Sequence, residues 1–394
     1  MTRETVLNNA RIVLSEEVLH GSVLIRDGLI AGISSGPVAA GAAGEDVGGD
    51  YLLPGVVELH TDHLEYHYSP RPGVRWDPVP AVLASDAQLT AGGATTVLDA
   101  VRIGSSADEK RDAAAATARH LADSIELAAG AGLMRAEHAI HVRCEVSAPN
   151  CLDAFGEFVD DPYVKLVSLM DHTPGQRQYA DLEVFKRFHI GMGYVAEDEF
   201  DAFVAPLLEQ SALYSDKYRR AIAGLAAERG ITLATHDDAT SDHVAESVAL
   251  GGCISEFPTT VLAAGEAAKH GQQIVMGAPN IVRGGSQSGN VAAAELLELG
   301  LLHILSSDYV PSSPLQAVFQ LVADGAIELP EGARLVSGNP ARAVGLDDRG
   351  EIALGRRADL VRVGAHDLPA TEGHPRGVRV PVVRGVYREG VRVA

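Results

Sequence analysis

LLPGVVELHTDHLEYH, residues 52–67, is the stretch that decides the fold. It begins as an apolar run of the kind that forms a buried strand, and it ends in a crowd of histidine and carboxylate side chains. A strand that served packing alone would not carry polar groups at this point. Because alternate residues of a strand point the same way, His60 and Asp62 can hold one ion together. The stretch therefore predicts a strand whose carboxyl end belongs to a metal site.

Seven further apolar runs follow, separated by amphipathic segments. We expect strands at residues 55–60, 94–100, 139–146, 164–172, 231–237, 253–257, 273–280 and 302–308, helices at 108–132 and 215–230, and an extra helical excursion within 173–230. This alternation is typical of an α/β protein with a (β/α)₈ TIM-like barrel. An open doubly wound sheet would alternate in the same way, but no glycine-rich phosphate turn follows the first strand.

The two ends of the chain have a different pattern. Residues 1–50 and 346–394 contain short apolar alternations, and the sequence Arg26–Asp27–Gly28 between two of them indicates a hairpin. Such segments can pair with each other although they lie at opposite ends of the chain. We therefore expect a small β-sandwich made from residues 1–50 and 346–394, beside a barrel of residues 51–345.

The overall composition excludes some partners. The net charge is −21, which disfavours binding to nucleic acid or to an anionic membrane surface. Three cysteines, Cys144, Cys151 and Cys253, form no CxxC pair and are expected to stay reduced. There is no apolar signal segment at the start and no run of 18 apolar residues. We expect a cytoplasmic protein.

Polar side chains stand at the end of almost every expected strand. They are mainly histidines and carboxylates: His60, Asp62, Asp99, Glu145, Asp171, His172, His236, Asp237, Asp238, Glu256, Asn280 and Asp308. In a barrel these ends converge on one mouth. Imidazole and oxygen ligands suit Zn²⁺, Mn²⁺ or a similar ion, and bound cations would relieve the repulsion among clustered carboxylates.

Each of these residues taken alone has a simpler explanation. An isolated polar group at a strand end is commonly just hydrogen-bonded, and Asp308 could cap a following helix. We favour Asp308 as a carboxylate that takes a proton from the attacking water, because it follows the eighth strand. His63 alternates away from His60, and His67 lies beyond the strand, so neither is expected to be a ligand.

The motifs resemble those of a known family. LPGVVELHTDHLE (53–65) resembles the first-strand signature of the amidohydrolase superfamily, with H-x-D in place of H-x-H. SGNPARAVGLDDRGEIALGRRADLVRV (337–363) resembles the segment with which the chain of these proteins returns from the barrel to the β-sandwich. More narrowly, the chain is similar to the metal-dependent triphosphate hydrolases of the carbon–phosphorus lyase pathway. The motifs are RPGVRW, LMDHTPGQRQY, THDDAT, EFPTT, MGAPNIVRGGSQSGN and SSDYVPSS.

The resemblance implies roles for the polar residues. His60 and Asp62 would hold one ion, His172 and His236 the second, and Asp308 would be the proton shuttle. Glu145 would bridge the ions where many relatives use a modified lysine. It implies one or two divalent ions, with Zn expected and Mn or Fe as alternatives. The implied reaction is hydrolysis of alpha-D-ribose 1-methylphosphonate 5-triphosphate, in phosphonate catabolism, to the 5-monophosphate and pyrophosphate.

An anionic substrate needs local cations in a chain of this charge. The loop 280–290 follows the seventh strand, near the place where barrels commonly bind phosphate, and glycines there allow close approach of backbone N–H groups. Glycine-rich loops are more often plain turns, and loop arginines are often solvated or pair between subunits. We expect the following phosphate-binding residues: Arg283, Ser286, Ser288, Asn290, Gln176, Arg177 and Arg71.

Two other functions stay open. A C–N hydrolase acting on a cyclic amide, N-acyl or amine substrate would use the same fold and metals, although the donor-rich 280–290 loop favours a phosphorylated substrate. A non-catalytic assembly protein on a degenerate barrel would have lost the ligands that this chain retains. Because barrels of this superfamily often dimerise, we expect a homodimer.

Overall fold

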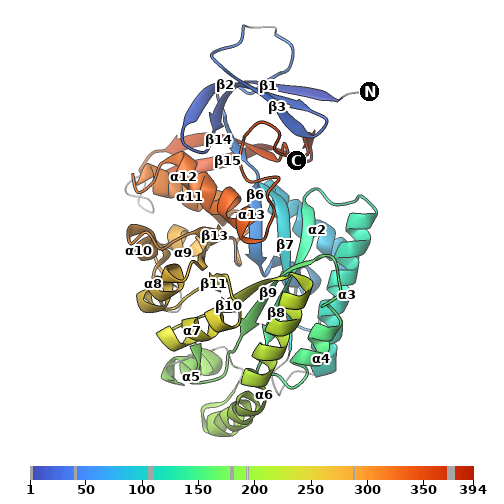
Figure 1. Ribbon diagram of the computed structural model, residues 1–394, viewed down its shortest axis with the longest axis vertical. Coiled ribbons are helices and arrows are strands. Elements are labelled where there is room, and N and C mark those ends of the chain that lie inside the picture. Colours follow the sequence, from blue (N-terminus) through green and yellow to red (C-terminus); the bar gives the residue numbers. More distant parts are fainter. Residues whose placement is uncertain are drawn as a thin grey trace.

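Eight parallel strands, hydrogen-bonded in chain order, form the central sheet of the computed structural model (Figure 1). The structure describes residues 3–39, 42–104, 111–177, 182–191, 193, 195–286, 289–370 and 378–394. The strands are β6 (Val56–Thr61), β7 (Ala94–Ile103), β8 (Glu137–Glu145), β9 (Val164–Met170), β10 (Thr232–His236), β11 (Ile254–Glu256), β12 (Gln273–Gly277) and β13 (Ile304–Ser306). A parallel bridge between Thr61 and Asp308 joins the last strand to the first. The predicted barrel is therefore confirmed.

The strands are buried on both faces, as expected for a parallel sheet covered by helices. All six residues of β6 are buried. One small apolar layer fills the interior with residues from seven of the strands: Val57, Leu59, Leu98, Leu166, Ala234, Ile254, Val275 and Ile304. The interior is thus a packed core, and space for a site exists only at the strand ends.

Helices surround the barrel. They are α1 (His63–Tyr68), α2 (Pro78–Ala91), α3 (Arg111–Gly130), α4 (Cys151–Gly156), α5 (Leu182–Gly191), α6 (Phe200–Arg229), α7 (Ser241–Ala249), α8 (Val261–Lys269), α9 (Ala278–Arg283), α10 (Ala293–Glu298), α11 (Ser313–Ala323), α12 (Leu329–Ala333) and α13 (Asn339–Ala343), with the short turns η2 (Glu197–Glu199) and η3 (Arg334–Gly338). The predicted excursion is confirmed as α5, η2 and α6, which enclose a small core of Phe185, Phe200 and Val204.

Most predicted boundaries differ from the structure by a few residues: β7 runs to Ile103 where 100 was expected, and β13 covers only Ile304–Ser306 of the expected 302–308. The expected strand 273–280 ends at Gly277, because Pro279 in the first turn favours a helix start and cannot donate to a strand ladder. The expected helix 215–230 is the second half of α6, which begins at Phe200. The expected helix 108–132 is α3, and residues 108–110 lie outside the described residues.

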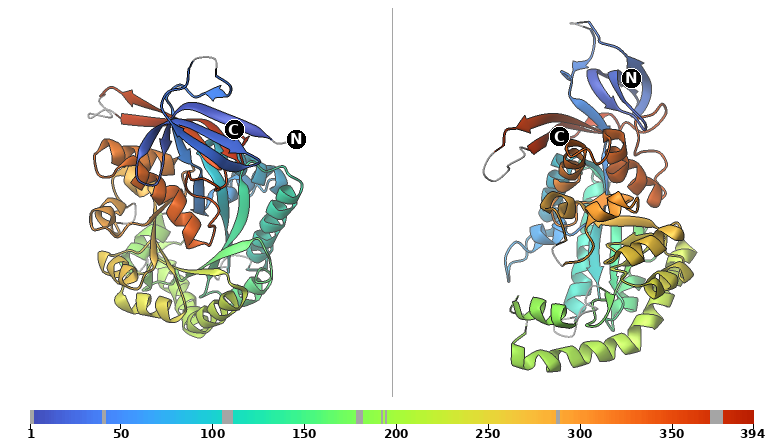
Figure 2. Two further views of the ribbon diagram at one scale, coloured as in Figure 1. Left: turned by 45° about the horizontal axis from the view of Figure 1, so that its top comes forward. Right: turned by 90° about the vertical axis from the view of Figure 1, so that its left-hand side faces the viewer.

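Both ends of the chain contribute to a second sheet. Its strand order is β16-β15-β14-β5-β1-β2-β3, with strands β1 (Glu4–Val13), β2 (Val18–Arg26), β3 (Leu29–Ser35), β4 (Glu45–Asp46), β5 (Tyr51–Pro54), β14 (Leu360–Leu368), β15 (Val378–Arg388) and β16 (Val391–Arg392). The N-terminal and C-terminal parts meet where β5 pairs with β14, and both termini lie at this end of the molecule (Figure 2). Asp27 and Gly28 have φ of 50° and 85°, which fits the predicted hairpin between β2 and β3.

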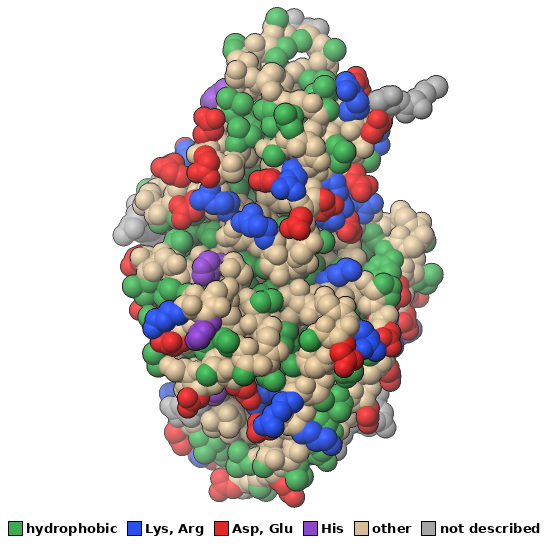
Figure 3. Space-filling model, viewed as in Figure 1, with side chains coloured by type: hydrophobic (Ala, Val, Ile, Leu, Met, Phe, Trp, Pro, Cys, Tyr) green, Lys and Arg blue, Asp and Glu red, His purple; other side chains and the backbone are tan. Residues whose placement is uncertain are grey.

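The second sheet lies against the amino ends of the barrel strands. The N–H of Gly55 donates to the Asp359 carbonyl at 2.9 Å, and the guanidinium of Arg388 donates to the Ala136 carbonyl at 2.6 Å. The carboxyl ends of the strands therefore point away from this sheet. Basic and acidic side chains are interspersed on the face shown in Figure 3. Within the described part of the chain, none of the helices combines the length and apolar character that a membrane crossing requires.

Candidate metal centre

A cleft with a volume of about 200 Å³ opens at the carboxyl ends of the barrel strands. Many of the predicted site residues line it: His60, Asp62, His172, His236, Asp308, Arg283, Ser286 and Asn290. The cleft is also lined by Asp237, whose role the sequence left open, and by Arg143, which the sequence analysis missed.

The first group of possible ligands is His60, Asp62 and Asp308. One ligand atom from each lies within 4.8 Å of the others, and His60 Nε2 is 3.7 Å from Asp62 Oδ1. The closure of the barrel brings them together, because the Asp308 N–H donates to the His60 carbonyl and the Asp62 N–H donates to the Asp308 carbonyl. These two bonds hold Asp308 at a φ of 51°, a conformation that is strained for aspartate. Such strain is common where a side chain must be aimed at a site.

The second group is His172, His236 and Asp237. The Nε2 atoms of His172 and His236 lie 3.7 Å and 3.5 Å from Asp237 Oδ2. Asp237 also has a left-handed backbone, with φ of 57°, directly after β10. The His60 and His236 rings stack with centroids 5.6 Å apart, so the two groups are neighbours in one cleft.

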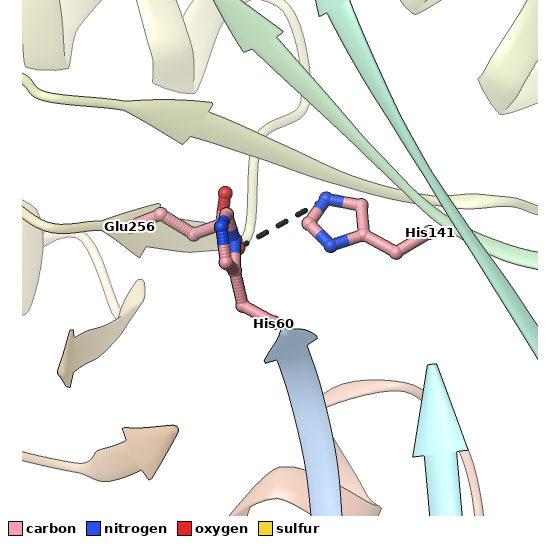
Figure 4. Close-up of side chains that lie close together, drawn as sticks. All are labelled: His60, His141 and Glu256. Atoms are coloured by element: carbon pink, nitrogen blue, oxygen red, sulfur yellow. Dashed lines mark hydrogen bonds and ion pairs between the residues drawn. The ribbon is translucent and has the colours of Figure 1, made fainter. Parts of the chain in front are cut away.

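A third cluster lies beneath the cleft and is fully buried: His60, His141 and Glu256 (Figure 4). Glu256 accepts hydrogen bonds from Nδ1 of His60 at 2.9 Å and from Nδ1 of His236 at 3.2 Å. His141 Nδ1 donates to the Leu59 carbonyl at 2.9 Å, so its Nε2 accepts the Ser168 hydroxyl at 2.8 Å. Hydrogen bonds therefore account for this cluster, whereas the two groups above face the cleft.

Both cleft groups combine imidazole nitrogen with carboxylate oxygen, and this donor set fits a divalent ion such as Zn²⁺. Asp62, Asp237 and Asp308 place three carboxyl groups in one cleft. Carboxylates held this close repel one another unless they are protonated or neutralised by cations. The residues present thus fit the divalent metals that the predicted fold implies.

One protein cation already lies in this cluster of acids. The Arg143 guanidinium is largely buried and pairs with Asp62, while its Nε lies 3.3 Å from Met170 Sδ. Burial favours the neutral form of Asp62, but Arg143, His60 and His236 together outweigh it and lower the pKa of Asp62. No cationic side chain of the described residues lies within hydrogen-bonding distance of Asp308, and burial raises the pKa of Asp308 despite the opposing effect of His60.

The histidines of the cleft are held by carboxylates behind them. Burial would lower the pKa of His60, but Glu256 and Asp62 together outweigh it and raise that pKa. Burial would raise the pKa of Glu256, but histidines that include His60 and His236 outweigh it and keep that pKa well below its usual range. His141 is different, because burial lowers its pKa to about 3 and keeps the ring neutral.

Glu145 was expected to bridge the two ions. In the structure its Oε2 accepts from His172 Nδ1 at 2.6 Å and its Oε1 accepts from the His172 N–H at 3.0 Å. Burial of Glu145 is opposed by His172, which lowers the pKa of the carboxyl. Glu145 thus contacts the outer side of one histidine and belongs to neither cleft group.

The predicted phosphate-binding residues divide into two sets. Arg283, Ser286 and Asn290 line the cleft, and Ser288 lies outside the described residues. Two glycines of this loop use their N–H groups internally, since Gly284 donates to the Ile281 carbonyl and Gly285 to the Asn280 carbonyl. Those two N–H groups are therefore not directed at the cleft, whereas Arg283, Ser286 and Asn290 line it.

The other three predicted residues lie outside this lining. Arg177 is buried, pairs with Asp238 and with Glu246 at 3.2 Å, and donates to the His236 carbonyl at 3.3 Å. Gln176 lines a neighbouring cavity. Arg71 is exposed in the segment between α1 and α2.

Two residues expected at strand ends have the simpler role of a hydrogen-bonded polar group. Asp99, which lies within β7, pairs with His138 at 2.6 Å, and Asp171, after β9, pairs with Arg219 at 2.7 Å. His63 and His67 both contact Gln88 and lie outside the groups, as predicted. The N-cap alternative for Asp308 is wrong, because α11 begins after Ser312.

Three polar residues within strands near the cleft were not predicted from the sequence: Glu58, His141 and Arg143. His141, Arg143 and Glu145 are every second residue of β8, so their side chains share the inward face of the strand. Once Glu145 was predicted to face inward, the same alternation would have predicted His141 and Arg143. Glu58 precedes His60 by two residues and accepts from the N–H groups of His60 and Ser307, which ties β6 to β13 below the site. Burial raises the pKa of Glu58 to about 7.

Comparisons with known proteins agree with this geometry. A model described as the amidohydrolase family matches residues 210–394. Alpha-D-ribose 1-methylphosphonate 5-triphosphate diphosphatase of Escherichia coli (strain K12) is 45% identical over 392 residues, which cover 98% of this chain and 100% of that protein.

Two solved structures share the fold. N-isopropylammelide isopropylaminohydrolase from Burkholderia multivorans has a TM-score of 0.60 at 18% identity, covering 99% of this chain and 97% of its own. N-acetylglucosamine-6-phosphate deacetylase from Pasteurella multocida has a TM-score of 0.58 at 13% identity, covering 99% of both chains. Because it is 45% identical to the Escherichia coli diphosphatase over nearly its whole length, the chain belongs to the amidohydrolase family, in the group that contains that enzyme.

Proposed function

We propose that this protein hydrolyses alpha-D-ribose 1-methylphosphonate 5-triphosphate to the 5-monophosphate and pyrophosphate. The observation that carries the proposal is the juxtaposition, in one cleft, of two imidazole–carboxylate groups with the side chains of Arg283, Ser286 and Asn290. The full-length identity to a diphosphatase with this substrate in its name supports the choice of substrate. A C–N hydrolase would need no cationic loop facing the ligand groups.

The two groups would hold the ions separately. His60, Asp62 and Asp308 would hold one, and His172, His236 and Asp237 the other. When bound, such cations act as Lewis acids that neutralise charge on phosphoryl oxygens and make water more acidic. We propose Zn²⁺, with Mn²⁺ or Fe as alternatives, and we retain the cytoplasmic location and the homodimer as predictions.

Asp308 would accept the proton of the attacking water. It lines the cleft at the seam between β6 and β13, and its backbone is fixed by two hydrogen bonds to the strand that carries His60. The water oxygen bonds to phosphorus, the anhydride bond between the first and second phosphates breaks, and pyrophosphate takes the bonding electrons as it leaves. A carboxylate positioned within reach of the water can serve as the general base for such a step.

The negative charge of the chain is offset locally. Arg143 places a buried guanidinium beside Asp62, and Arg283 stands at the carboxyl end of α9 on the cleft wall. Guanidinium groups bind phosphate with charge-assisted hydrogen bonds. The net charge of −21 is therefore compatible with a polyphosphate substrate, since two arginines are placed in the cleft.

Product analysis tests the proposal. We expect one pyrophosphate for each 5-monophosphate formed from the ribose triphosphate, in a reaction that ³¹P NMR follows directly. Release of single phosphates in sequence would contradict it. Turnover of cyclic or N-acyl amides without turnover of the triphosphate would establish the C–N hydrolase instead.

Arg283→Met is expected to raise KM for the triphosphate by about 10- to 100-fold, because a charge-assisted hydrogen bond is worth about 1.5–3 kcal/mol. The rate constant kcat should change little if Arg283 binds the substrate equally in its ground and transition states. Steady-state kinetics of pyrophosphate release provide the measurement. Arg220→Met, at an exposed position on α6, is the matched control and should leave KM unchanged. Equal KM values for the two variants would remove Arg283 from the binding site.

A further inference from the structure

Every histidine of the two cleft groups turns one ring nitrogen away from the cleft and towards a buried carboxylate. Nδ1 of His60 and Nδ1 of His236 contact the two oxygens of Glu256, at 2.9 Å and 3.2 Å. Nδ1 of His172 contacts Glu145 at 2.6 Å. One carboxylate, Glu256, thus serves two histidines that belong to different groups.

These contacts decide which nitrogen of each ring is free to bind an ion. An ionised carboxylate only accepts hydrogen bonds, so Nδ1 of each ring must carry the proton. Nε2 then presents its lone pair, and it is the Nε2 atoms of His60 and His236 that lie 3.7 Å and 3.5 Å from the carboxylates of Asp62 and Asp237. A carboxylate behind a ligating histidine commonly fixes the tautomer in this way.

The surroundings of Glu256 suit this task. Glu256 is fully buried at the end of β11, and His141, 4.0 Å away, is already bonded to Leu59 and Ser168. The next residue, Phe257, packs edge-on against His60 and His236, with ring centroids 4.9 Å and 5.3 Å apart. Two consecutive residues therefore set both the proton position and the ring plane of the same two histidines.

We propose that Glu256 is a positioning residue that sets the tautomers of His60 and His236 together, so that both ion groups depend on one carboxylate. The inference rests on the ion groups of the proposed function and is independent of the substrate. In this role Glu256 does not contact either ion, and it acts on each ion group through the histidine to which it is hydrogen-bonded.

Glu256→Gln provides the test, because an amide of the same shape has one acceptor oxygen in place of two. It can accept the Nδ1 proton of one histidine, and its NH₂ group must face Nδ1 of the other. That second ring then has to carry its proton on Nε2, the atom that faces the cleft. We expect the variant to retain one Zn²⁺ with unchanged affinity and to bind the second about 10- to 100-fold more weakly.

Two measurements are needed, and neither depends on turnover. Zn²⁺ titration against a chelator gives the two affinities. ¹⁵N NMR of the histidine rings in the metal-free protein gives the tautomers, and we expect Nδ1–H on both His60 and His236 in the wild type and on only one of them in the variant. Glu266→Gln, at a surface position on α8, is the control and should match the wild type in both measurements.

The outcomes separate the inference from the proposed function. Two Zn²⁺ ions bound by Glu256→Gln with wild-type affinities would overturn the inference alone, as would neutral His60 and His236 rings of the wild type that carry their proton on Nε2 and not on Nδ1. The wild-type spectrum decides the matter even if the variant fails to fold. A wild-type protein that binds no divalent ion would overturn the proposed function and the inference with it.

Discussion

Asp308→Asn is expected to lower kcat for pyrophosphate release by about 10²- to 10⁴-fold, the usual contribution of a general base. The amide is nearly the same size as the carboxyl, and it can keep the left-handed backbone of this position, which asparagine tolerates well. It cannot take a proton from water. The loss should therefore fall on kcat, and KM should stay close to its wild-type value.

Rapid-quench measurement of pyrophosphate in a single turnover isolates the chemical step. The variant must also contain as much metal as the wild type, because Asp308 belongs to the group formed with His60 and Asp62. Asn290→Ala, which changes another polar residue of the lining, is the comparison and should raise KM without a comparable loss in kcat. A single-turnover rate within a few-fold of the wild type, at equal metal content, would exclude Asp308 as the base.

His138→Gln is expected to destabilise the fold by about 3–5 kcal/mol, the cost of breaking a buried ion pair by removing one partner. His138 lies at the amino end of the barrel, fully buried, with Nδ1 2.6 Å from Asp99 and Nε2 3.2 Å from Asp86. Arg135 is the other side chain that pairs with Asp86, at 3.0 Å. The glutamine would leave Asp99 without its cationic partner, and denaturant unfolding measures the difference.

The same cluster predicts how stability depends on pH. Burial would lower the pKa of His138, but Asp99 and Asp86 outweigh it and raise the pKa from 6.5 to about 9. The protonated ring is favoured in the folded state, so its contribution is full below pH 6.5 and is lost as pH rises through about 9. That contribution is about 3 kcal/mol.

The free energy of unfolding of the wild type should fall by this amount across the interval, whereas that of His138→Gln should lack this component. His120→Gln, at an exposed position on α3, should behave as the wild type. Parallel curves for wild type and His138→Gln would mean that His138 is neutral in the folded protein.

The sequence was sufficient to predict the barrel and part of the site because both are carried by local patterns. Apolar runs of strand length located β6 to β13, and position at a strand end selected His60, Asp62, His172, His236 and Asp308. The end of β12 was misplaced because Met276 and Gly277 continue the apolar run up to Pro279. The start of α9 near this proline depends on the tertiary structure, which the local sequence pattern does not contain.

The rest depended on partners that are distant in sequence. Arg177 and Arg283 both belong to polar stretches of the sequence, yet Arg177 is buried against Asp238 while Arg283, the last residue of α9, faces the cleft. Glu256 ends β11 and Asp237 directly follows β10, and only the neighbouring histidines give them different roles. Charge and position in the chain do not distinguish these cases, because the difference lies in which strands become neighbours.

The bridge between Thr61 and Asp308 affects how the protein is made. Asp308 follows the last barrel strand, whereas His60 and Asp62 belong to the first, so a ribosome must complete nearly the whole barrel before this ligand group can assemble. A nascent chain that ends before β13 has no such site. A cation that binds the assembled group and not the open chain stabilises the joined ends by mass action. A metal ion held by this group would therefore couple metal supply to the final step of folding.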